Sequence, residues 1–267
     1  MSFTFISGAT GGLGKAFAVQ CAMRGENLFL TSTKNDKLKV LAEALSGTYK
    51  ISVNYKKCNM AESSERDELI SYIKSENMLF NKIINTAGLD YEGEFLTLDN
   101  AKIRNLIRVN VESVIDITYS IMGLRAPEEK FNIITISSLA GHFAMPFKAL
   151  YAASKSMLTS FYRALAREVK KDNVSVMLLC PAGIPTNPEW TKSVESQGFI
   201  SVLSTKNVGI VVFKTLLKAD KGTLMYIPGL VNNFAAFIGG LMPSSVMSNI
   251  IYKRWVKTRA RAEKIAQ

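Results

Sequence analysis

Short apolar runs that suit buried strands alternate with amphipathic segments along most of the chain. The runs 3–7, 27–33 and 50–58 predict the first three strands, and helix-forming segments follow them at 15–26, 36–47 and 63–76. The second of these helices is expected to close at Gly47. Because parallel strands are joined through helical crossovers, this alternation favours a parallel sheet with helices on both faces.

The alternation continues as far as residue 229. Further strands are expected at 81–88, 131–138, 174–183 and 223–229, and further helices at 100–124, 149–172 and 205–219. Residues 184–203 form a long connection after a predicted strand, where ligands bind in open α/β sheets, so we expect it to cover the substrate. The pattern predicts one α/β domain over residues 1–267, a doubly wound parallel sheet of the Rossmann type, with 230–267 as a C-terminal helical extension.

The extension carries an apolar stretch, Phe234 to Met242, and then a basic segment with six Lys or Arg and one acid between Lys253 and Lys264. One interpretation is an interfacial membrane anchor with Phe, Ile and Trp255 facing lipid. The favoured interpretation is that the extension packs on its own domain and walls the substrate cleft. The stretch is too short to span a bilayer, and no basic region precedes Phe3, so no secretory signal is expected.

Charge and cysteine content narrow the class of protein. The 33 basic and 22 acidic residues give a net charge of +11, which could favour nucleic acid or an anionic membrane. A solvated basic surface with an anionic cofactor is preferred, because no zinc-finger spacing, basic zipper or aromatic RNA-binding box is present. Cys21, Cys58 and Cys180 form no C-x-x-C pair, which predicts buried thiols, a reducing cytoplasmic location and no metal site.

A glycine-rich loop, "SGATGGLG" from Ser7 to Gly14, lies between the first predicted strand and helix. Glycine permits a tight turn and close backbone approach, and the free N–H groups at a helix start attract a pyrophosphate. In this context the loop predicts a dinucleotide site.

Several motifs occur in the order and spacing of one family. They are Gly8-x-x-x-Gly12-x-Gly14, "NTAG" at 85–88, Asn110, Ser138, Tyr151-x-x-x-Lys155 and "CPAGIPT" at 180–186. Together they resemble the short-chain dehydrogenase/reductase family over residues 3 to about 228. The departures are Ser7 for threonine, Asn59 for aspartate, Thr86 for asparagine and Ala182 for glycine, and none removes a group that the reaction needs.

The resemblance implies a catalytic tetrad of Asn110, Ser138, Tyr151 and Lys155, in which Lys155 also holds the cofactor's ribose and Asn110 holds a proton-relaying water. It implies that Gly8 to Gly14 hold the pyrophosphate, that Asn85, Ala87 and Gly88 line the adenine-ribose side, and that Ile184 and Thr186 touch the carboxamide. The full set of expected cofactor residues is Gly8, Ala9, Thr10, Gly11, Gly12, Leu13, Gly14, Ser32, Thr33, Lys34, Asn59, Met60, Asn85, Ala87, Gly88, Tyr151, Lys155, Pro181, Gly183, Ile184 and Thr186.

These four residues have the chemical groups that the reduction of a ketone requires. Tyr151 and Lys155 are four residues apart on one helix face, and the ammonium is expected to lower the pKa of the phenol toward the operating pH. Tyr151 would give a proton to the carbonyl oxygen, while Ser138 donates a hydrogen bond to it. His142, the only histidine, is expected near the cleft mouth and not as a base.

The second strand ends in Ser32, Thr33 and Lys34, with no carboxylate until Asp36 inside the next helix. Hydroxyls and a cation suit a 2′-phosphate, so NADP is predicted over NAD. The predicted function is an NADP(H)-dependent oxidoreductase that interconverts a ketone and a secondary alcohol on an apolar substrate, such as a steroid or acyl compound. The alternatives are a non-catalytic cofactor-binding sensor and a peripheral membrane-associated binding protein.

Assembly is predicted to be a homodimer. The helices at 100–124 and 150–171 resemble those that pair across the family's four-helix interface, with apolar positions at Ile103, Leu106, Ile107, Val114, Leu158, Phe161, Tyr162 and Leu165. The extension after Gly229 is expected to block the face used by tetramers.

Overall fold

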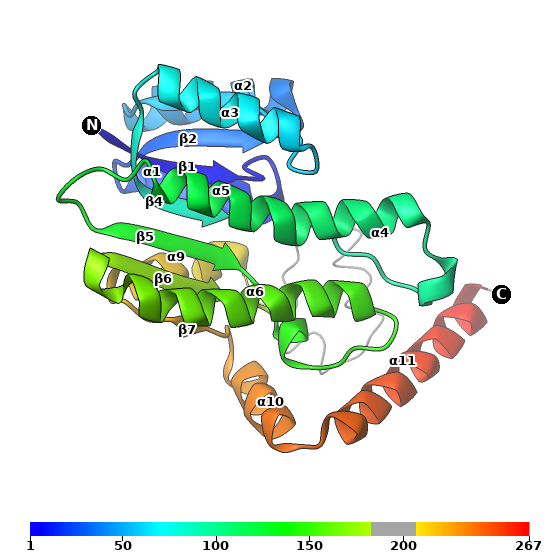
Figure 1. The fold of residues 1–267 in the computed structure, drawn as a ribbon. Helices are drawn as coiled ribbons and strands as arrows, with labels where there is room; N and C mark the ends of the chain where they lie inside the picture. The colour runs from blue at the N-terminus through cyan, green and yellow to red at the C-terminus, as the bar shows by residue number, and fades with distance from the viewer. Residues whose placement is uncertain (183–206, 267) are drawn as a thin grey trace.

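The computed structural model describes residues 1–182 and 207–266 as a seven-stranded parallel sheet between two layers of helices (Figure 1). The strand order is β3-β2-β1-β4-β5-β6-β7. The strands are β1 Ser2–Ser7, β2 Asn27–Ser32, β3 Val53–Lys57, β4 Leu79–Asn85, β5 Phe131–Ile136, β6 Val174–Leu179 and β7 Met225–Tyr226. This confirms the predicted doubly wound α/β fold.

The helices follow the strands as the alternation predicts. They are α1 Gly12–Met23, α2 Asn35–Tyr49, α3 Ser63–Ser75, α4 Asn100–Ile107, α5 Ser113–Met122, α6 Ala149–Glu168, α9 Val208–Asp220, α10 Leu230–Leu241 and α11 Ser244–Ala266. A π-helical turn, η2 Arg108–Glu112, joins α4 to α5, and short 3₁₀ turns are η1 Phe95–Thr97, η3 Leu139–His142 and η4 Val169–Asp172.

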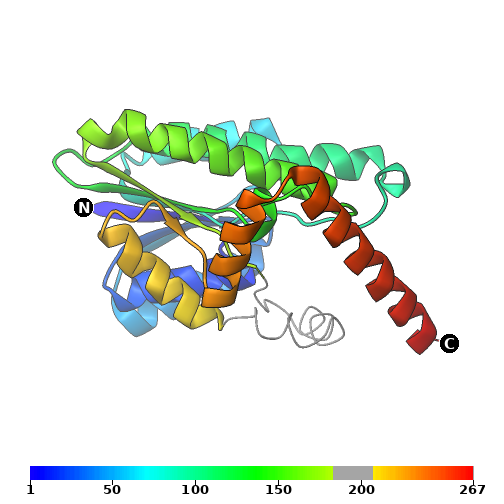
Figure 2. The ribbon, with the colours of Figure 1, turned by 90° about the horizontal axis from the view of Figure 1, so that it is seen from below.

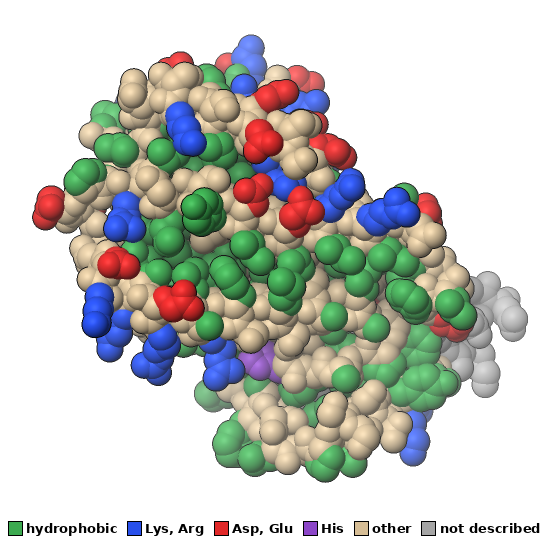
Figure 3. All heavy atoms as spheres, viewed as in Figure 1, with side chains coloured by type: hydrophobic (Ala, Val, Ile, Leu, Met, Phe, Trp, Pro, Cys, Tyr) green, Lys and Arg blue, Asp and Glu red, His purple; other side chains and the backbone are tan. Residues whose placement is uncertain are grey.

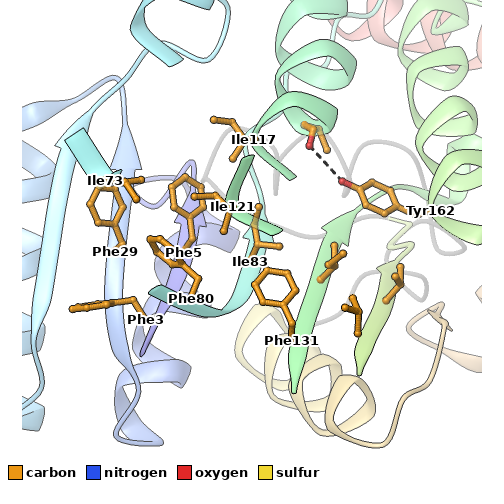
Figure 4. Packing of buried hydrophobic residues seen from close by; sticks show 14 of the residues in the cluster. Phe3, Phe5, Phe29, Ile73, Phe80, Ile83, Ile117, Ile121, Phe131 and Tyr162 are labelled. Carbon is orange, nitrogen blue, oxygen red and sulfur yellow. Dashed lines mark hydrogen bonds between the residues drawn. The ribbon is translucent and has the colours of Figure 1, made fainter. Parts of the chain in front are cut away.

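Two cores lie on the two faces of the sheet. Successive strand residues point to opposite faces, so Phe5 packs with α3, α5 and α6 in one cluster, while Ile6 packs with α1, α2 and α9 in the other. The first core is aromatic: Phe5 stacks on Phe29 at 5.7 Å between ring centroids and meets Phe80 edge-on at 6.0 Å (Figure 4). Figure 2 shows the layers edge-on, with α4 to α6 on one side of the sheet. Burial on both faces explains the near-continuous apolar strands.

Some element boundaries differ from the predictions. Gly47 lies inside α2, which continues to Tyr49 and ends at Lys50 in the left-handed conformation with φ 57°. The helix expected at 100–124 changes to a π turn in its middle. The last strand has only two residues, and the connection expected at 184–203 lies outside the described residues.

Candidate active site

The order of the strands reverses between β1 and β4. Ser7, at the end of β1, pairs with Asn85 at the end of β4, so the loops that leave these two strands start side by side. Ligands of doubly wound sheets bind at such a switch point. The sheet therefore brings the predicted glycine loop and the "NTAG" motif together.

The glycine loop fits a pyrophosphate because its backbone has no room for side chains. Gly8 has φ 65°, and a Cβ there would stand 2.8 Å from the Ala87 nitrogen. A Cβ on Gly14 would stand 2.2 Å from the Gly8 carbonyl oxygen. The helix α1 begins at Gly12 without a side-chain cap, which leaves its first amides available for an anion.

The residues expected at the ribose phosphate lie together at the end of β2. The Thr10 hydroxyl donates to the Ser32 hydroxyl at 2.9 Å, and the Lys34 amide donates to the same oxygen at 3.1 Å. Ser32 is buried and thus shapes the turn, whereas the side chains of Thr33 and Lys34 are exposed. Asp36 lies in the first turn of α2, as predicted.

Asn59 lies at the predicted adenosine site, whereas the side chain of Asn85 is buried in the core beside it. The Asn59 amide oxygen accepts from the Ala61 nitrogen at 3.2 Å. The Asn85 amide nitrogen points into the core and contacts the hydroxyls of Thr118, Thr135 and Tyr162 at 2.9, 3.3 and 3.3 Å. Asn85 thus holds β4, α5, β5 and α6 together, while the backbone of the following residues faces the glycine loop.

Ser138, Tyr151 and Lys155 converge where β5 ends and α6 begins. The Ser138 side chain caps η3 by accepting from the Ala140 nitrogen at 3.1 Å and donates to the Pro181 carbonyl at 3.4 Å, and its hydroxyl is near enough to Tyr151 to lower the pKa of the phenol. Lys155 is 5% exposed, donates to the Ile136 carbonyl at 2.9 Å and lies 5.8 Å from the Tyr151 ring centroid. A cation, a phenol and a hydroxyl therefore share one buried corner.

The prediction for the tyrosine pKa is wrong for this structure. Burial and then the Asp90 carboxylate raise the pKa of Tyr151 to about 12, against the lowering effect of the nearby Ser138 hydroxyl. Burial also lowers the pKa of Lys155 to about 8. The ammonium is directed at the Ile136 carbonyl, and desolvation of both groups outweighs the expected stabilisation of the phenolate.

Asn110 lies in the π turn η2 and is fully buried. Its amide oxygen accepts from the Leu89 nitrogen at 2.7 Å, and its amide nitrogen donates to the Leu89 carbonyl at 2.9 Å and to Ser154 at 3.2 Å. A Cβ on Gly88 would stand 3.5 Å from both the Asn110 oxygen and the Lys155 nitrogen. The structure thus brings all four tetrad residues to one region.

A cluster of three charged side chains beside Tyr151 was not predicted from the sequence. The Lys148 ammonium lies 2.6 Å from Asp90 and 3.5 Å from Glu92, and 5.6 Å from the Tyr151 ring centroid. The only sequence signal is a lysine three residues before the tyrosine, which does not reveal its partners on the loop after β4.

Other predicted residues lie elsewhere or outside the described part. The Pro181 carbonyl accepts from the Leu139 nitrogen at 2.9 Å, whereas Gly183, Ile184 and Thr186 lie outside the described residues. His142 lines a cavity of about 570 Å³, whose described lining includes Ala149, Ala153 and Ser248 but no tetrad residue. The expectation that His142 lies near the mouth of the catalytic cleft stays a prediction. Burial, then Arg163, lowers the pKa of His142.

The extension packs on the loop that precedes Tyr151, as the favoured interpretation expected. Phe147 stacks on Tyr252 at 5.6 Å and tilts against Trp255 at 6.5 Å, and a Cβ on Gly239 would strike the Phe143 ring. Trp255 thus contacts its own domain instead of facing lipid. In the described residues, no helix is long and apolar enough to cross a membrane.

Comparisons with known proteins identify the family of the chain. A family model described as short chain dehydrogenase matches residues 2–197. The chain is 26% identical to a very-long-chain 3-oxoacyl-CoA reductase from Anas platyrhynchos over 97% of this chain and 82% of that one. It is 31% identical to a 7beta-hydroxysteroid dehydrogenase from Clostridium sardiniense over 72% of each chain. The fold resembles that of a short-chain dehydrogenase from Sphingobium yanoikuyae in complex with NADPH, with TM-score 0.74 and 20% identity over 90% of this chain and 94% of that one.

The chain belongs to the short-chain dehydrogenase/reductase family. It is an oxidoreductase that acts on CH–OH groups with a nicotinamide cofactor.

Proposed function

We propose that the protein is an NADP(H)-dependent oxidoreductase that interconverts a bulky apolar ketone and its secondary alcohol. The observation that carries this proposal is the tetrad, in which Ser138 lies near Tyr151 and the buried Lys155 ammonium lies 5.8 Å from the Tyr151 ring centroid. A non-catalytic cofactor-binding sensor would be expected to lack Tyr151 or Lys155, and the chain carries both.

The tetrad residues would move one proton and hold one oxygen. A nicotinamide supplies or accepts the hydride when bound. The Tyr151 phenol would protonate the carbonyl oxygen during reduction and take the alcohol proton during oxidation. The Ser138 hydroxyl would donate a hydrogen bond to that oxygen as its charge grows. Lys155 would favour the phenolate once its ammonium turns from the Ile136 carbonyl toward the ribose.

The preference for NADP rests on the end of β2. Lys34 is exposed there and forms no ion pair within the described part of the chain, and Thr33 beside it offers a hydroxyl. The relative from Sphingobium yanoikuyae, which is complexed with NADPH, supports this preference. The substrate class rests on two relatives, one a 3-oxoacyl-CoA reductase and the other a hydroxysteroid dehydrogenase.

Turnover with a substrate panel tests the proposal. The panel would contain a ketosteroid, a 3-oxoacyl thioester and a small keto sugar, each with NADPH and NADH. We expect oxidation of NADPH by one of the two apolar substrates and little with the sugar. If only the sugar were reduced, or if NADH were the better donor, the corresponding part of the proposal would be wrong.

We also propose that the extension touches an anionic membrane surface. Leu230, Phe234, Phe237 and Leu241 recur along one face of α10 and are 90%, 67%, 65% and 70% exposed. α10 has no charged residue, and the following helix α11 carries Lys253, Arg254 and Lys257. An exposed apolar face followed by cations suits the boundary between lipid headgroups and acyl chains.

Sedimentation with vesicles tests the membrane contact. The protein should bind vesicles rich in phosphatidylglycerol and not pure phosphatidylcholine, and Phe234→Glu should abolish binding. Phe213→Glu is a matched control, because Phe213 on α9 is also exposed, at 47%. If Phe234→Glu changed the mass in solution and not vesicle binding, α10 would contact a second copy and the membrane proposal would fail.

A homodimer through α4 to α6 stays a prediction, with a changed set of contacts. Leu106, Val114, Leu158 and Tyr162 are buried in the protomer core, so they cannot form the interface. The exposed apolar residues of these helices include Ile107, Tyr119 and Met157. Figure 3 shows apolar side chains gathered over this face. A cytoplasmic location also stays a prediction; Cys21, Cys58 and Cys180 are buried free thiols.

A further inference from the structure

A buried arginine connects two segments of the predicted site that are far apart in the sequence. Arg66 on α3 is 3% exposed. Its guanidinium donates to the Met60 carbonyl at 2.7 Å, to the Asp116 carboxylate at 2.6 Å and to the Glu112 carboxylate. All three contacts reach different segments, so one planar group joins the loop after β3, the π turn η2 and helix α5.

Two of these segments carry predicted site residues. Met60 follows Asn59 in the loop that is expected to contact the adenine. Glu112 is the last residue of the π turn η2 and lies two positions after Asn110. Because Asn110 in turn binds both backbone groups of Leu89, a displacement of the π turn would also move the loop beside Lys155.

Arginine is the side chain that this arrangement requires. A π turn is a rare departure from α-helical geometry and is often found at functional sites, so it needs contacts that hold it. Burial alone would lower the pKa of Arg66, but hydrogen bonds to Asp116 and Glu112 outweigh burial and raise that pKa. Lysine offers a point charge and lacks the fork that reaches three acceptors in fixed directions.

We propose that Arg66 is a positioning residue that couples the adenine-side loop at Met60 to the π turn that carries Asn110. Cofactor that orders the Met60 loop would, through Arg66, fix the turn and hence the Asn110–Leu89 contact. The role of Asn110 in turnover rests on the proposed function, whereas the coupling between the two segments does not.

Three conservative variants test the coupling. Arg66→Lys keeps the charge and loses the fork, so NADPH should dissociate about tenfold more readily and kcat should fall about tenfold. Glu112→Gln weakens only the contact to the π turn, so kcat should fall several-fold while NADPH affinity changes less than twofold. Arg24→Lys is the matched control, because Arg24 pairs with Asp220 at 2.9 Å between α1 and α9; both quantities should stay unchanged.

A purely structural arginine would give a different result. Arg66→Lys would then lower the melting temperature while kcat and NADPH affinity stayed within twofold, and this outcome would overturn the proposal. Equal losses of affinity and kcat in Glu112→Gln would also contradict it. If Arg66→Lys did not fold, Glu112→Gln would decide.

Hydrogen exchange separates this proposal from the proposed function. Adding NADPH to the wild type should slow exchange of the amides at 108–112, and Arg66→Lys should lose that protection while still binding NADPH. This measurement needs no turnover. If no ketone were reduced, the proposed function would fail, but hydrogen exchange would still test the coupling. Unchanged protection of these amides in Arg66→Lys would refute the coupling.

Discussion

Replacing Lys155 by Met should change how the stability of the protein depends on pH. Burial lowers the pKa of Lys155 from 10.5 to about 8. The gap between these values corresponds to about 3 kcal/mol. Below about pH 8 the lysine is charged in both the folded and unfolded chains, so the whole cost of burying the charge is present at neutral pH.

The sign follows from proton binding in the two states. Between about pH 8 and 10.5 the unfolded lysine still holds its proton and the folded lysine does not, so the contribution of Lys155 to stability rises with pH. The buried cysteines make stability fall as the pH rises, because burial raises the pKa of Cys58 and of Cys180 from 9.0 to about 12. Total stability therefore mixes the two trends, and the wild type must be compared with Lys155→Met at each pH.

Urea unfolding at intervals from about pH 7 to 10.5 measures this difference. The stability of the wild type minus that of Lys155→Met should increase by about 3 kcal/mol across the range. Loss of the hydrogen bond to the Ile136 carbonyl changes the free energy of unfolding by the same amount at every pH, so it does not change how the difference depends on pH. Lys74→Met, at an exposed position on α3, should show no such slope. A difference for Lys155→Met that is flat with pH to within about 1 kcal/mol would refute the buried-charge argument.

The cofactor loop, the end of β2 and the assembly can each be tested with single substitutions. Gly14→Ala should lose NADPH affinity and melt at a lower temperature, because its Cβ would stand 2.2 Å from the Gly8 carbonyl oxygen. Gly47→Ala is the control: a Cβ there would have no atom within 4 Å, so this variant should be neutral or stabilising by up to about 1 kcal/mol. Equal effects of the two substitutions in calorimetry and titration would contradict this prediction. Lys34→Ala should reduce the preference for NADPH over NADH in fluorescence titration, and an unchanged ratio would show that Lys34 does not read the 2′-phosphate. Light scattering should show a dimer, and Tyr119→Lys, at a 78% exposed site on α5, should convert it to monomers. A chain that ends near Gly229 should shift toward higher order. A tetramer with the extension present would show that the extension does not block the tetramer face.

The fold and the tetrad could be predicted because their signals are local. Strand and helix periodicities stand in short windows, and the glycine loop and Tyr151-x-x-x-Lys155 are contiguous motifs. The π turn at 108–112 could not be predicted, since the apolar periodicity continues through it. Arg66 also gave no signal, because its acceptors at 112 and 116 are remote in sequence.

Burial explains the remaining errors. The pKa of Tyr151 was predicted to fall because the neighbouring lysine is visible in the sequence, whereas the desolvation that raises this pKa depends on the packed structure. The same limit applies to the dimer face, where helical spacing does not distinguish Leu158, which faces its own sheet, from Met157, which is exposed.

In the proposed function, Tyr151 transfers the proton to the ketone, and the other residues of the site bind and orient the cofactor. Tyr151→Phe keeps the ring and removes only the hydroxyl, so turnover should fall about 100-fold or more, while the NADPH dissociation constant changes less than about threefold. Both quantities can be measured on one sample, by consumption of NADPH with the best ketone of the panel and by fluorescence titration. Retention of more than about a tenth of the wild-type turnover would contradict the account.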